Sequence, residues 1–221
     1  MRKLSNRLAP RRRARSDEAR AARRDNILDA AAHLFAEGRV RDLRMVDVAR
    51  AAGLAKGTLY LYFPTKEALF LGLLDRDLGL WADALAADLA ALGPATPDAV
   101  AEAIATSLVE RPRLTRLLGL LHSVLEQNLA PETALDFKRA LLEGTAALGA
   151  MVEQCLSLPP GEGGRVLLRA HALVVGLRQM ADPPPLIADV LARPEMAPLR
   201  VDFADELRLS LAALLRGLSP R

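Results

Sequence analysis

The segment 46–70, VDVARAAGLAKGTLYLYFPTKEALF, constrains the fold of this chain more than any other feature. Apolar residues recur at helical spacing both before and after Gly53. A glycine between two such runs favours a tight turn, because glycine tolerates the positive φ angle that many turns need. We therefore predict two short helices, over 45–52 and 56–62, joined at Gly53.

A longer helix is expected to follow these two. Pro64 ends the second short helix, since proline lacks the main-chain donor that a helix needs to continue. Thr65 is a suitable N-cap for a new helix that runs from Lys66 to about residue 91. On the second short helix, Leu59 and Phe63 fall on the side that we expect to face the core.

The second short helix also carries polar side chains that suit the major groove of DNA. Lys56, Thr58, Tyr60 and Tyr62 lie close together along it. Ammonium and phenol groups can bind phosphates at the edges of the groove, and a threonine can meet a base edge or a thymine methyl. The pattern predicts a helix-turn-helix that binds DNA.

Charge is unevenly distributed along the 221 residues, although the net charge is only +3. Residues 1–66 hold 16 Lys and Arg against 7 Asp and Glu, whereas the remainder holds 14 against 20. A basic N-terminal third joined to an acidic remainder favours a nucleic-acid module attached to a different one. The alternative is a cationic tail on an ordinary helical protein.

Residues 1–16 form the most basic stretch of the chain. They contain seven cationic residues and no acid: Arg2, Lys3, Arg7, Arg11, Arg12, Arg13 and Arg15. We expect this arm to be disordered by itself and to follow DNA phosphates or enter a minor groove. A solubilising tail is the alternative.

The rest of the chain has the pattern of an all-α protein. Ser16 is placed to cap a helix over 17–37, and Gly38 to end it. Prolines and glycines then separate helical segments at roughly 98–110, 113–128, 132–157, 163–180 and 201–217. No segment alternates with the period of a strand. We predict a helix-turn-helix DNA-binding domain over 17–65 and a helical effector-binding and dimerisation domain over 66–221.

The N-terminal motifs resemble a known family. Three motifs within roughly residues 20–70 look like the DNA-binding domain of the TetR family of bacterial repressors. They are ILDAAAHLFAEG, VARAAG and KGTLYLYFPTKEALF. The resemblance implies an all-α homodimer in which three N-terminal helices hold the helix-turn-helix and the other helices bind a ligand and dimerise. It also implies that a small-molecule effector releases the protein from a palindromic, double-stranded DNA operator. The C-terminal two thirds resemble the family mainly in helix count and layout.

The resemblance assigns DNA-facing positions residue by residue. Lys66 matches a frequent phosphate contact, and Gly57 would let the main chain approach DNA closely. The positions implied on the second short helix and just after it are Lys56, Gly57, Thr58, Tyr60, Leu61, Tyr62 and Lys66.

Three sites depart from the family pattern. The family commonly has hydroxyl residues just before each of the two short helices. Here Leu43 and Arg44 precede the first helix, and Ala55 precedes the second. Each lost cap costs about 1 kcal/mol. Arg44 is expected to offset this loss by contacting phosphate itself. Leu61 stands where a polar residue is more usual. It can contact a thymine methyl but offers no hydrogen bond, so we predict weaker sequence discrimination at that base step.

Two segments, 163–180 and 201–217, are predicted to form the homodimer interface as a four-helix arrangement. Each has apolar residues at helical spacing. They are Val166, Leu167, Ala170, Leu173, Val174 and Leu177 in the first segment, and Phe203, Leu207, Leu211, Leu214, Leu215 and Leu218 in the second. The alternative is that both stripes fill the core of one subunit.

An effector is expected to bind among the helices of the second domain. Trp81 could line an apolar pocket, and His171 lies in an apolar helix where it could polarise a ligand. His122 and Glu126 share a helix face and could fix a polar ligand atom. The alternatives are core packing for Trp81 and His171, and a surface pair for the other two.

Other classes of function lack their motifs in this sequence. A phosphate-binding glycine loop, HExxH and a nucleophile elbow are all missing, so we expect no enzyme. The histidines and the single cysteine, Cys155, lack metal-ligand spacing, and we expect no metal and no cofactor. The chain has no secretory signal and no apolar run long enough for a membrane span, which favours a soluble, cytoplasmic protein. An architectural DNA binder that relies on the basic arm is the alternative function.

Overall fold

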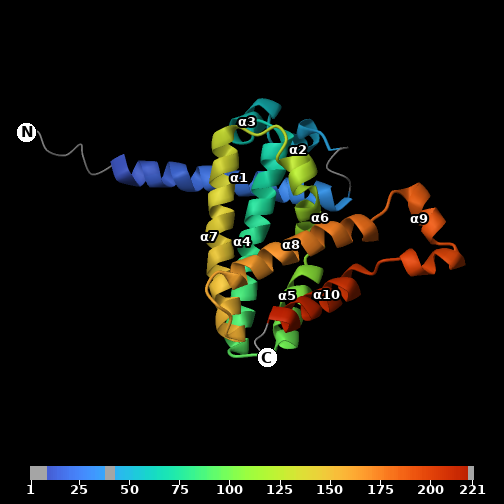
Figure 1. The fold of residues 1–221 in the computed structure, drawn as a ribbon. Coiled ribbons are helices and arrows are strands. Elements are labelled where there is room, and N and C mark those ends of the chain that lie inside the picture. The colour runs from blue at the N-terminus through green and yellow to red at the C-terminus, as the bar shows by residue number, and fades with distance from the viewer. Residues whose placement is uncertain (1–8, 38–42, 219–221) are drawn as a thin grey trace, which may run out of the picture. The chain divides into compact units, whose positions relative to one another are not determined.

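The computed structural model describes residues 9–37 and 43–218, and these form helices and connecting turns without a strand (Figure 1). The predicted all-α fold is confirmed. Two compact units divide the chain, residues 1–73 and 74–221, and the division falls inside helix α4 (Lys66–Leu92). The predicted domain boundary lies at the start of α4, so the first turns of this helix belong to the first unit.

The first unit contains α1 (Ala9–Glu37), α2 (Met45–Ala51), α3 (Lys56–Tyr62) and the start of α4. Apolar side chains from α1, α3 and α4 meet in its core, where the ring centroids of Phe35 and Phe70 lie 5.7 Å apart. Its largest fully buried side chains include Ile27, Leu28, Phe35, Leu59, Leu69 and Phe70. The orientation predicted for Leu59 and Phe63 is confirmed, because both are buried.

Helix α1 begins at Ala9, which corrects two predictions. Residues 9–16 are helical where we expected a disordered arm, and Ser16 lies inside the helix instead of capping it. Arginine is a good helix former, and adding residues to an existing helix is far easier than nucleating one. Residues 1–8 and the predicted helix end at Gly38 lie outside the described residues.

The turn between α2 and α3 has the predicted glycine geometry. Gly53 has a φ of 67°, and the Leu54 amide donates to the Ala49 carbonyl at 2.8 Å. The side-chain amide of Asn26, on α1, donates to the Ala52 carbonyl at 3.0 Å and so fixes the end of α2. Thr65 accepts a hydrogen bond from the Ala68 amide at 3.0 Å, which confirms its predicted role as the cap of α4.

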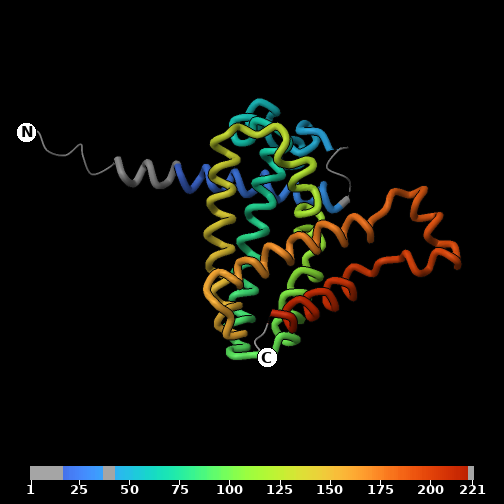
Figure 2. Tube along the Cα trace, in the orientation of Figure 1, coloured from blue at the N-terminus to red at the C-terminus, as the bar shows by residue number. Residues whose placement is uncertain are grey.

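The second unit is a bundle in which α7 packs on α8, and α10 packs on α5 and α8 (Figure 2). It comprises the remainder of α4, α5 (Pro97–Val109), α6 (Pro112–Leu120), the π-helical turn η1 (Leu121–Leu125), α7 (Pro131–Leu156), α8 (Glu162–Ala181), α9 (Pro185–Leu191), the 3-10 turn η2 (Pro194–Leu199) and α10 (Phe203–Leu218).

Two parts of this unit differ from the predicted segments. The helix predicted over 113–128 changes to π geometry after Leu120, and the Glu126 amide donates to the Leu121 carbonyl at 3.0 Å. The proline-rich stretch before α10, predicted as a break, contains α9 and η2, which extend away from the rest of the unit (Figure 1). Arg200 holds them together by donating to the carbonyl of Leu191 at 2.6 Å and to that of Ala192 at 2.8 Å.

Glycines bring α7 and α8 close together. A Cβ on Gly163 would collide with the carbonyl of Gly149, so neither helix could approach the other this closely with larger residues. Beside this crossing, the Glu153 carboxylate accepts hydrogen bonds from the amides of Gly161 and Gly163, at 2.7 Å and 2.9 Å. The first turn of α8 is therefore fixed to α7.

The two apolar stripes proposed for dimerisation lie mostly inside one subunit. Their buried members are Val166, Leu167, Ala170 and Val174 on α8, and Phe203, Leu207, Leu211 and Leu215 on α10. These eight side chains fill the core of their own subunit, as the alternative supposed. The other four stripe members, Leu173, Leu177, Leu214 and Leu218, are half-buried, and two leucines beside the stripes are exposed, Leu168 at 67% and Leu209 at 64%.

Candidate functional site

The outer side of α3 presents several of the predicted DNA-facing residues. Leu61 is 79% exposed and Tyr60 39% exposed, whereas Leu59 between the helix and the core is fully buried. The ammonium of Lys56, also exposed, lies 5.8 Å from the centroid of the Tyr60 ring, within cation–π range. Thr58 and Tyr62 are half-buried. The helix is thus anchored by one face and open on the other.

Gly57 has no packing partner that would require a glycine. A Cβ placed there would meet no heavy atom within 4 Å. Glycine in a helix costs up to about 1 kcal/mol relative to alanine, and no contact within the described structure requires it at this position. Lys66, at the start of α4, is half-buried.

Neither α2 nor α3 begins with a side chain that caps the helix, as the residues before each helix led us to expect. Neither Arg44 nor Ala55, the two N-cap residues, makes a capping hydrogen bond with its side chain. The Arg44 guanidinium instead donates to the Asp47 carboxylate, at 2.9 Å and 3.1 Å. This hydrogen bond raises the pKa of Arg44 and holds the pKa of Asp47 below its usual value. The Nη1 group takes part in neither of these bonds, so Arg44 can contact a DNA phosphate while it stays paired with Asp47.

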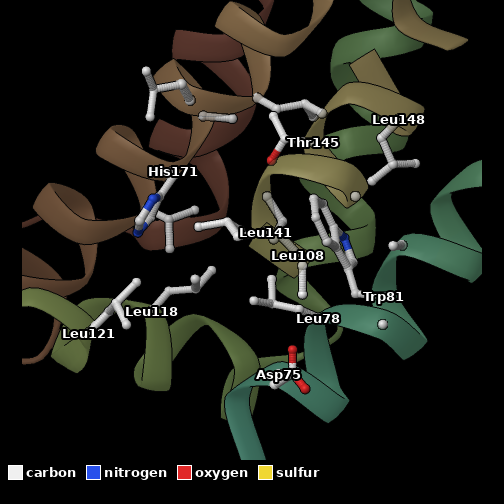
Figure 3. A pocket seen from close by; sticks show the side chains of 18 of the residues that line it. Asp75, Leu78, Trp81, Leu108, Leu118, Leu121, Leu141, Thr145, Leu148 and His171 are labelled. Atoms are coloured by element: carbon white, nitrogen blue, oxygen red, sulfur yellow. The ribbon is translucent and has the colours of Figure 1, made fainter. Parts of the chain in front are cut away.

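A cavity of about 240 Å³ lies within the second unit, between α4, α5, α6, η1, α7 and α8 (Figure 3). Leucines and one phenylalanine form most of its wall, including Leu78, Leu118, Leu121, Phe137, Leu141 and Leu148. Polar groups are few: Asp75, Thr145, His171 and the indole of Trp81. An apolar enclosure with a small number of polar groups is typical of a small-molecule site.

Trp81 and His171, two of the predicted ligand-binding residues, line this cavity from different helices (Figure 3). The Trp81 indole N–H donates to the Ser107 hydroxyl at 2.9 Å, so it is already satisfied. His171 is half-buried, and its Nε2 atom is shielded from solvent without a hydrogen-bond partner. Burial, followed by the charges of His122 and Lys138, lowers the pKa of His171.

His122 and Glu126, the other two predicted ligand residues, do not line the cavity. They pair with each other at 2.9 Å, and His122 is 60% exposed. Lys138 completes the group at 2.5 Å from the Glu126 carboxylate. Burial acts to raise the pKa of Glu126, but hydrogen bonds from Lys138 and His122 outweigh it and leave that pKa below its usual value. The surface-pair alternative describes these two residues, although the His122 ring lies 5.5 Å from the His171 ring.

Sequence reasoning missed two polar contacts that hold the cavity helices together. The buried carboxylate of Asp77 on α4 accepts two hydrogen bonds from Arg113 on α6, at 2.6 Å and 2.8 Å. Arg178 on α8 donates to the Thr115 hydroxyl at 3.0 Å and stacks 4.0 Å from the centroid of the Phe203 ring. These pairs are far apart in sequence, and no local motif distinguishes them from solvated charges.

Among the described residues, no cluster of histidine, cysteine, aspartate or glutamate has a geometry that could hold a metal ion. Over the same residues, none of the helices combines the length and the apolar character that a bilayer crossing requires.

Family models match both units. A model of the bacterial regulatory proteins of the tetR family matches residues 27–73, and one of the tetracyclin repressor-like C-terminal domain matches residues 75–221. The fatty acid metabolism regulator protein of Bacillus subtilis is 27% identical over 135 residues, 61% of this chain and 63% of that protein. The HTH-type transcriptional regulator EthR of Mycobacterium tuberculosis is 44% identical over 50 residues, 23% of each chain. The chain thus aligns with less than two thirds of the length of these curated relatives.

Solved structures share the fold over most of the chain. FadR, the fatty acid degradation regulator from Bacillus halodurans, has a TM-score of 0.59 at 18% identity, covering 90% of this chain and 97% of that one. FadR from Bacillus subtilis in complex with stearoyl-CoA has a TM-score of 0.51 at 20% identity, with coverages of 86% and 96%. A helix-turn-helix unit followed by a helical unit with an internal cavity defines a class of DNA-binding regulators with an effector site. The chain belongs to the TetR family of bacterial transcriptional regulators.

Proposed function

We propose that this protein is a ligand-responsive, sequence-specific repressor that a small molecule releases from a palindromic DNA operator. The observation that carries the proposal is α3, which is anchored through Leu59 and leaves Lys56, Tyr60 and Leu61 outward. A short helix with this division of faces suits insertion into a major groove.

The outward groups divide into phosphate and base contacts. Phosphates on either side of the groove are bound by Lys56, Tyr60, Tyr62 and Lys66. Arg44 joins them through the guanidinium nitrogen that does not bind Asp47. Thr58 and Leu61 meet base edges, and Gly57 allows the helix to come close. Because Leu61 offers only an apolar contact, it distinguishes thymine by its methyl group.

A homodimer supplies the second reading helix that a palindrome requires. Half-sites are about 34–36 Å apart, one turn of DNA, so two copies related by a two-fold axis bind successive major grooves. We place the interface on α8 and α10, within 163–180 and 201–217, and assign it to the outward leucines Leu168 and Leu209. The buried stripes of the same helices fill the subunit core instead.

The effector site is the cavity lined by Trp81 and His171. One helix, α4, carries Lys66 in the DNA-reading unit and both Leu78 and Trp81 in the cavity wall. A ligand that favours one position of α4 over another would change how well the dimer fits its operator, provided that it binds the two states with different affinity. The stearoyl-CoA complex of a protein with this fold supports an effector with an apolar part.

The proposal is tested by selecting binding sites from fragmented genomic DNA and footprinting the recovered fragments. We expect a palindrome that the wild-type protein protects. Leu61→Ala should lose its preference at one base step. Leu80→Ala is the matched control. It truncates a different exposed leucine, on α4, and should keep the wild-type footprint.

Deletion of residues 1–16 separates the main proposal from the architectural alternative. A specific repressor should keep its footprint, with lower affinity and a shallower dependence on salt, because fewer counterions are released. Loss of all DNA binding on deletion, together with no preferred sequence in the full chain, would show that the basic arm is the whole function.

A further inference from the structure

The volume of the cavity limits the size of a ligand. An apolar cavity of about 150 Å³ in another protein accommodates benzene, whereas this one measures about 240 Å³. By that comparison it holds roughly ten non-hydrogen atoms. A compact molecule therefore fits inside it, and the charge of the surrounding groups decides which compact molecules bind.

Asp75 on α4 is the only group in the described wall that is charged at neutral pH. It is exposed, and an exposed aspartate is ionised there. None of the described residues that line the cavity is a lysine or an arginine. His171, the other titratable residue in the wall, is mainly neutral at that pH, because burial lowers its pKa from the ordinary 6.5. The wall therefore has a net negative charge.

The charge of Asp75 is not used within the protein. Among the described residues, none forms a hydrogen bond or an ion pair with its carboxylate. Asp77, two residues along the same helix, provides the contrast, because it is buried and accepts two hydrogen bonds from Arg113, at 2.6 Å and 2.8 Å. A ligand at Asp75 would meet a carboxylate whose acceptor positions are all open.

Asp75 also lies where a charged group can bind at low cost. Its side chain is at the exposed end of the cavity, next to Leu78 and well apart from His171 (Figure 3). Leu78 and Trp81 follow it at intervals of three residues, on the same side of α4. A molecule with its charged end at Asp75 would place its apolar part against them. The charged end would keep part of its hydration, which avoids the cost of burying an ion among leucines.

Other charges near the cavity do not cancel that of Asp75. Lys138 and His122 act on the His171 ring, but neither of them lines the cavity. Lys138 is also paired with Glu126, at 2.5 Å. An anionic ligand would meet the Asp75 carboxylate and find no counter-charge in the described wall, whereas a cationic ligand would be attracted to it.

We propose that the effector is a compact, largely apolar molecule with one positive charge, a protonated amine, which pairs with the Asp75 carboxylate at the exposed end of the cavity. This inference rests on the proposed function, because it names the ligand class of the same cavity. Asp75 sets the preference for charge, while the leucine wall supplies most of the affinity, since an ion pair in contact with water contributes little by itself.

Calorimetric titration of the full-length protein at neutral pH and low ionic strength provides the test. The probes are octylamine, octanol and octanoate, which share an apolar chain and differ in charge. We expect octylamine to bind about three- to fivefold more tightly than octanol, the effect of an exposed ion pair. Octanoate should bind more weakly than octanol, because Asp75 repels it. The preference for the amine should shrink in about 1 M salt, which screens exposed charges.

Two variants locate the effect. Asp75→Asn keeps the shape of the side chain but removes its charge, so the amine should bind no better than the alcohol. Asp83→Asn removes the same charge from an exposed residue of α4 outside the cavity, and should preserve the wild-type order. Both positions are exposed, so neither change should affect folding.

Four results would overturn the proposal. They are equal binding of octylamine and octanol to the wild-type protein, tightest binding of octanoate, no binding of any probe, and a preference for the amine that Asp75→Asn leaves unchanged. An equal loss of preference in Asp75→Asn and Asp83→Asn would also overturn it, because the effect would then belong to the net charge of the protein.

Release of operator DNA is measured separately with the same probes. If octylamine binds with the expected preference but leaves the operator complex intact, the proposed repressor mechanism fails and the ligand class stands. If octanol or octanoate releases DNA while octylamine shows no preference over octanol, the ligand class fails and the mechanism stands.

Discussion

The two units use their buried residues in opposite ways. In the first unit, Leu59 is buried and stabilises the fold, whereas Leu61, two residues later, faces outward. The stability of this unit and its proposed recognition of DNA therefore depend on different side chains. In the second unit, Leu118, Leu121 and Leu148 are buried and also line the cavity. Stability and ligand binding therefore rest there on the same side chains. A mutation should separate the two properties in the first unit and couple them in the second.

The largest expected effect comes from the pair of leucines on α3. Leu59→Ala removes a fully buried side chain and should destabilise the first unit by about 3 kcal/mol. Leu61→Ala should change the free energy of unfolding by less than about 0.5 kcal/mol, since the residue is exposed. It should nevertheless alter the preference for operator sequence. Urea unfolding and DNA titration of both variants check this. Equal losses of stability would remove the contrast between the units.

Filling the cavity should show the coupling in the second unit. Ala170 is buried and lines the cavity, so Ala170→Leu can place added methyl groups in empty space and stabilise the protein by about 1–2 kcal/mol. The same variant should lose effector binding and stay on DNA. Ala101→Leu is the matched control, because Ala101 is fully buried away from the cavity and overpacking there should cost about 1–3 kcal/mol. If the two variants have the same free energy of unfolding, the cavity has no room for the added methyl groups.

Gly57→Ala tests the separation of roles in a single residue. No atom lies near a Cβ at this position, so alanine should stabilise α3 by up to about 1 kcal/mol. DNA affinity should fall, because the added methyl group keeps α3 from the groove. Thermal unfolding and operator titration give the two readings. Unchanged DNA affinity would show that close approach at this residue is not required.

The smallest expected effect is a pH dependence of stability. The pKa of His171 is lowered in the folded protein from its ordinary 6.5, first by burial and then by the charges of His122 and Lys138. The unfolded chain therefore binds the proton more readily. The contribution of His171 to stability should be fully present above about pH 6.5. It should be lost as the pH drops from there through the lower pKa that His171 has in the folded protein.

Replacement of the histidine checks the assignment. His171→Phe should reduce the slope of unfolding free energy against pH just below 6.5. Glu126, whose pKa lies below its ordinary 4.5, contributes its own loss only at more acidic pH. An unchanged slope in the His171 variant would assign the dependence to other groups.

The parts predicted well from sequence depend on short-range rules. Gly53, Pro64 and Thr65 act on their immediate neighbours, and the helix-turn-helix they delimit has the predicted limits to within a residue. The early start of α1 at Ala9 and the π turn after Leu120 were missed. The first depends on how far a helix propagates into a tail, and the second on how α6 meets its neighbours.

The candidate sites show the same division. Exposure on α3 could be anticipated, because 3.6 residues per helical turn place residues two apart, such as Leu59 and Leu61, on opposite faces. The cavity could not, because six elements from α4 to α8 enclose it and their separation depends on packing. Trp81 and His171 were singled out only as isolated residues, whereas His122 and Glu126, equally suggestive in sequence, proved to be a surface pair.

The sequence by itself determined that the chain is all-α, that α2 and α3 meet at Gly53, and that α3 turns polar groups outward, since these features follow from local backbone preference and helical period. Only the tertiary structure decided that the stripes on α8 and α10 fill the subunit's own core and that an apolar cavity lies beside an unpartnered His171 nitrogen. Both depend on contacts between distant segments, where burial, and not spacing, determines which atoms meet.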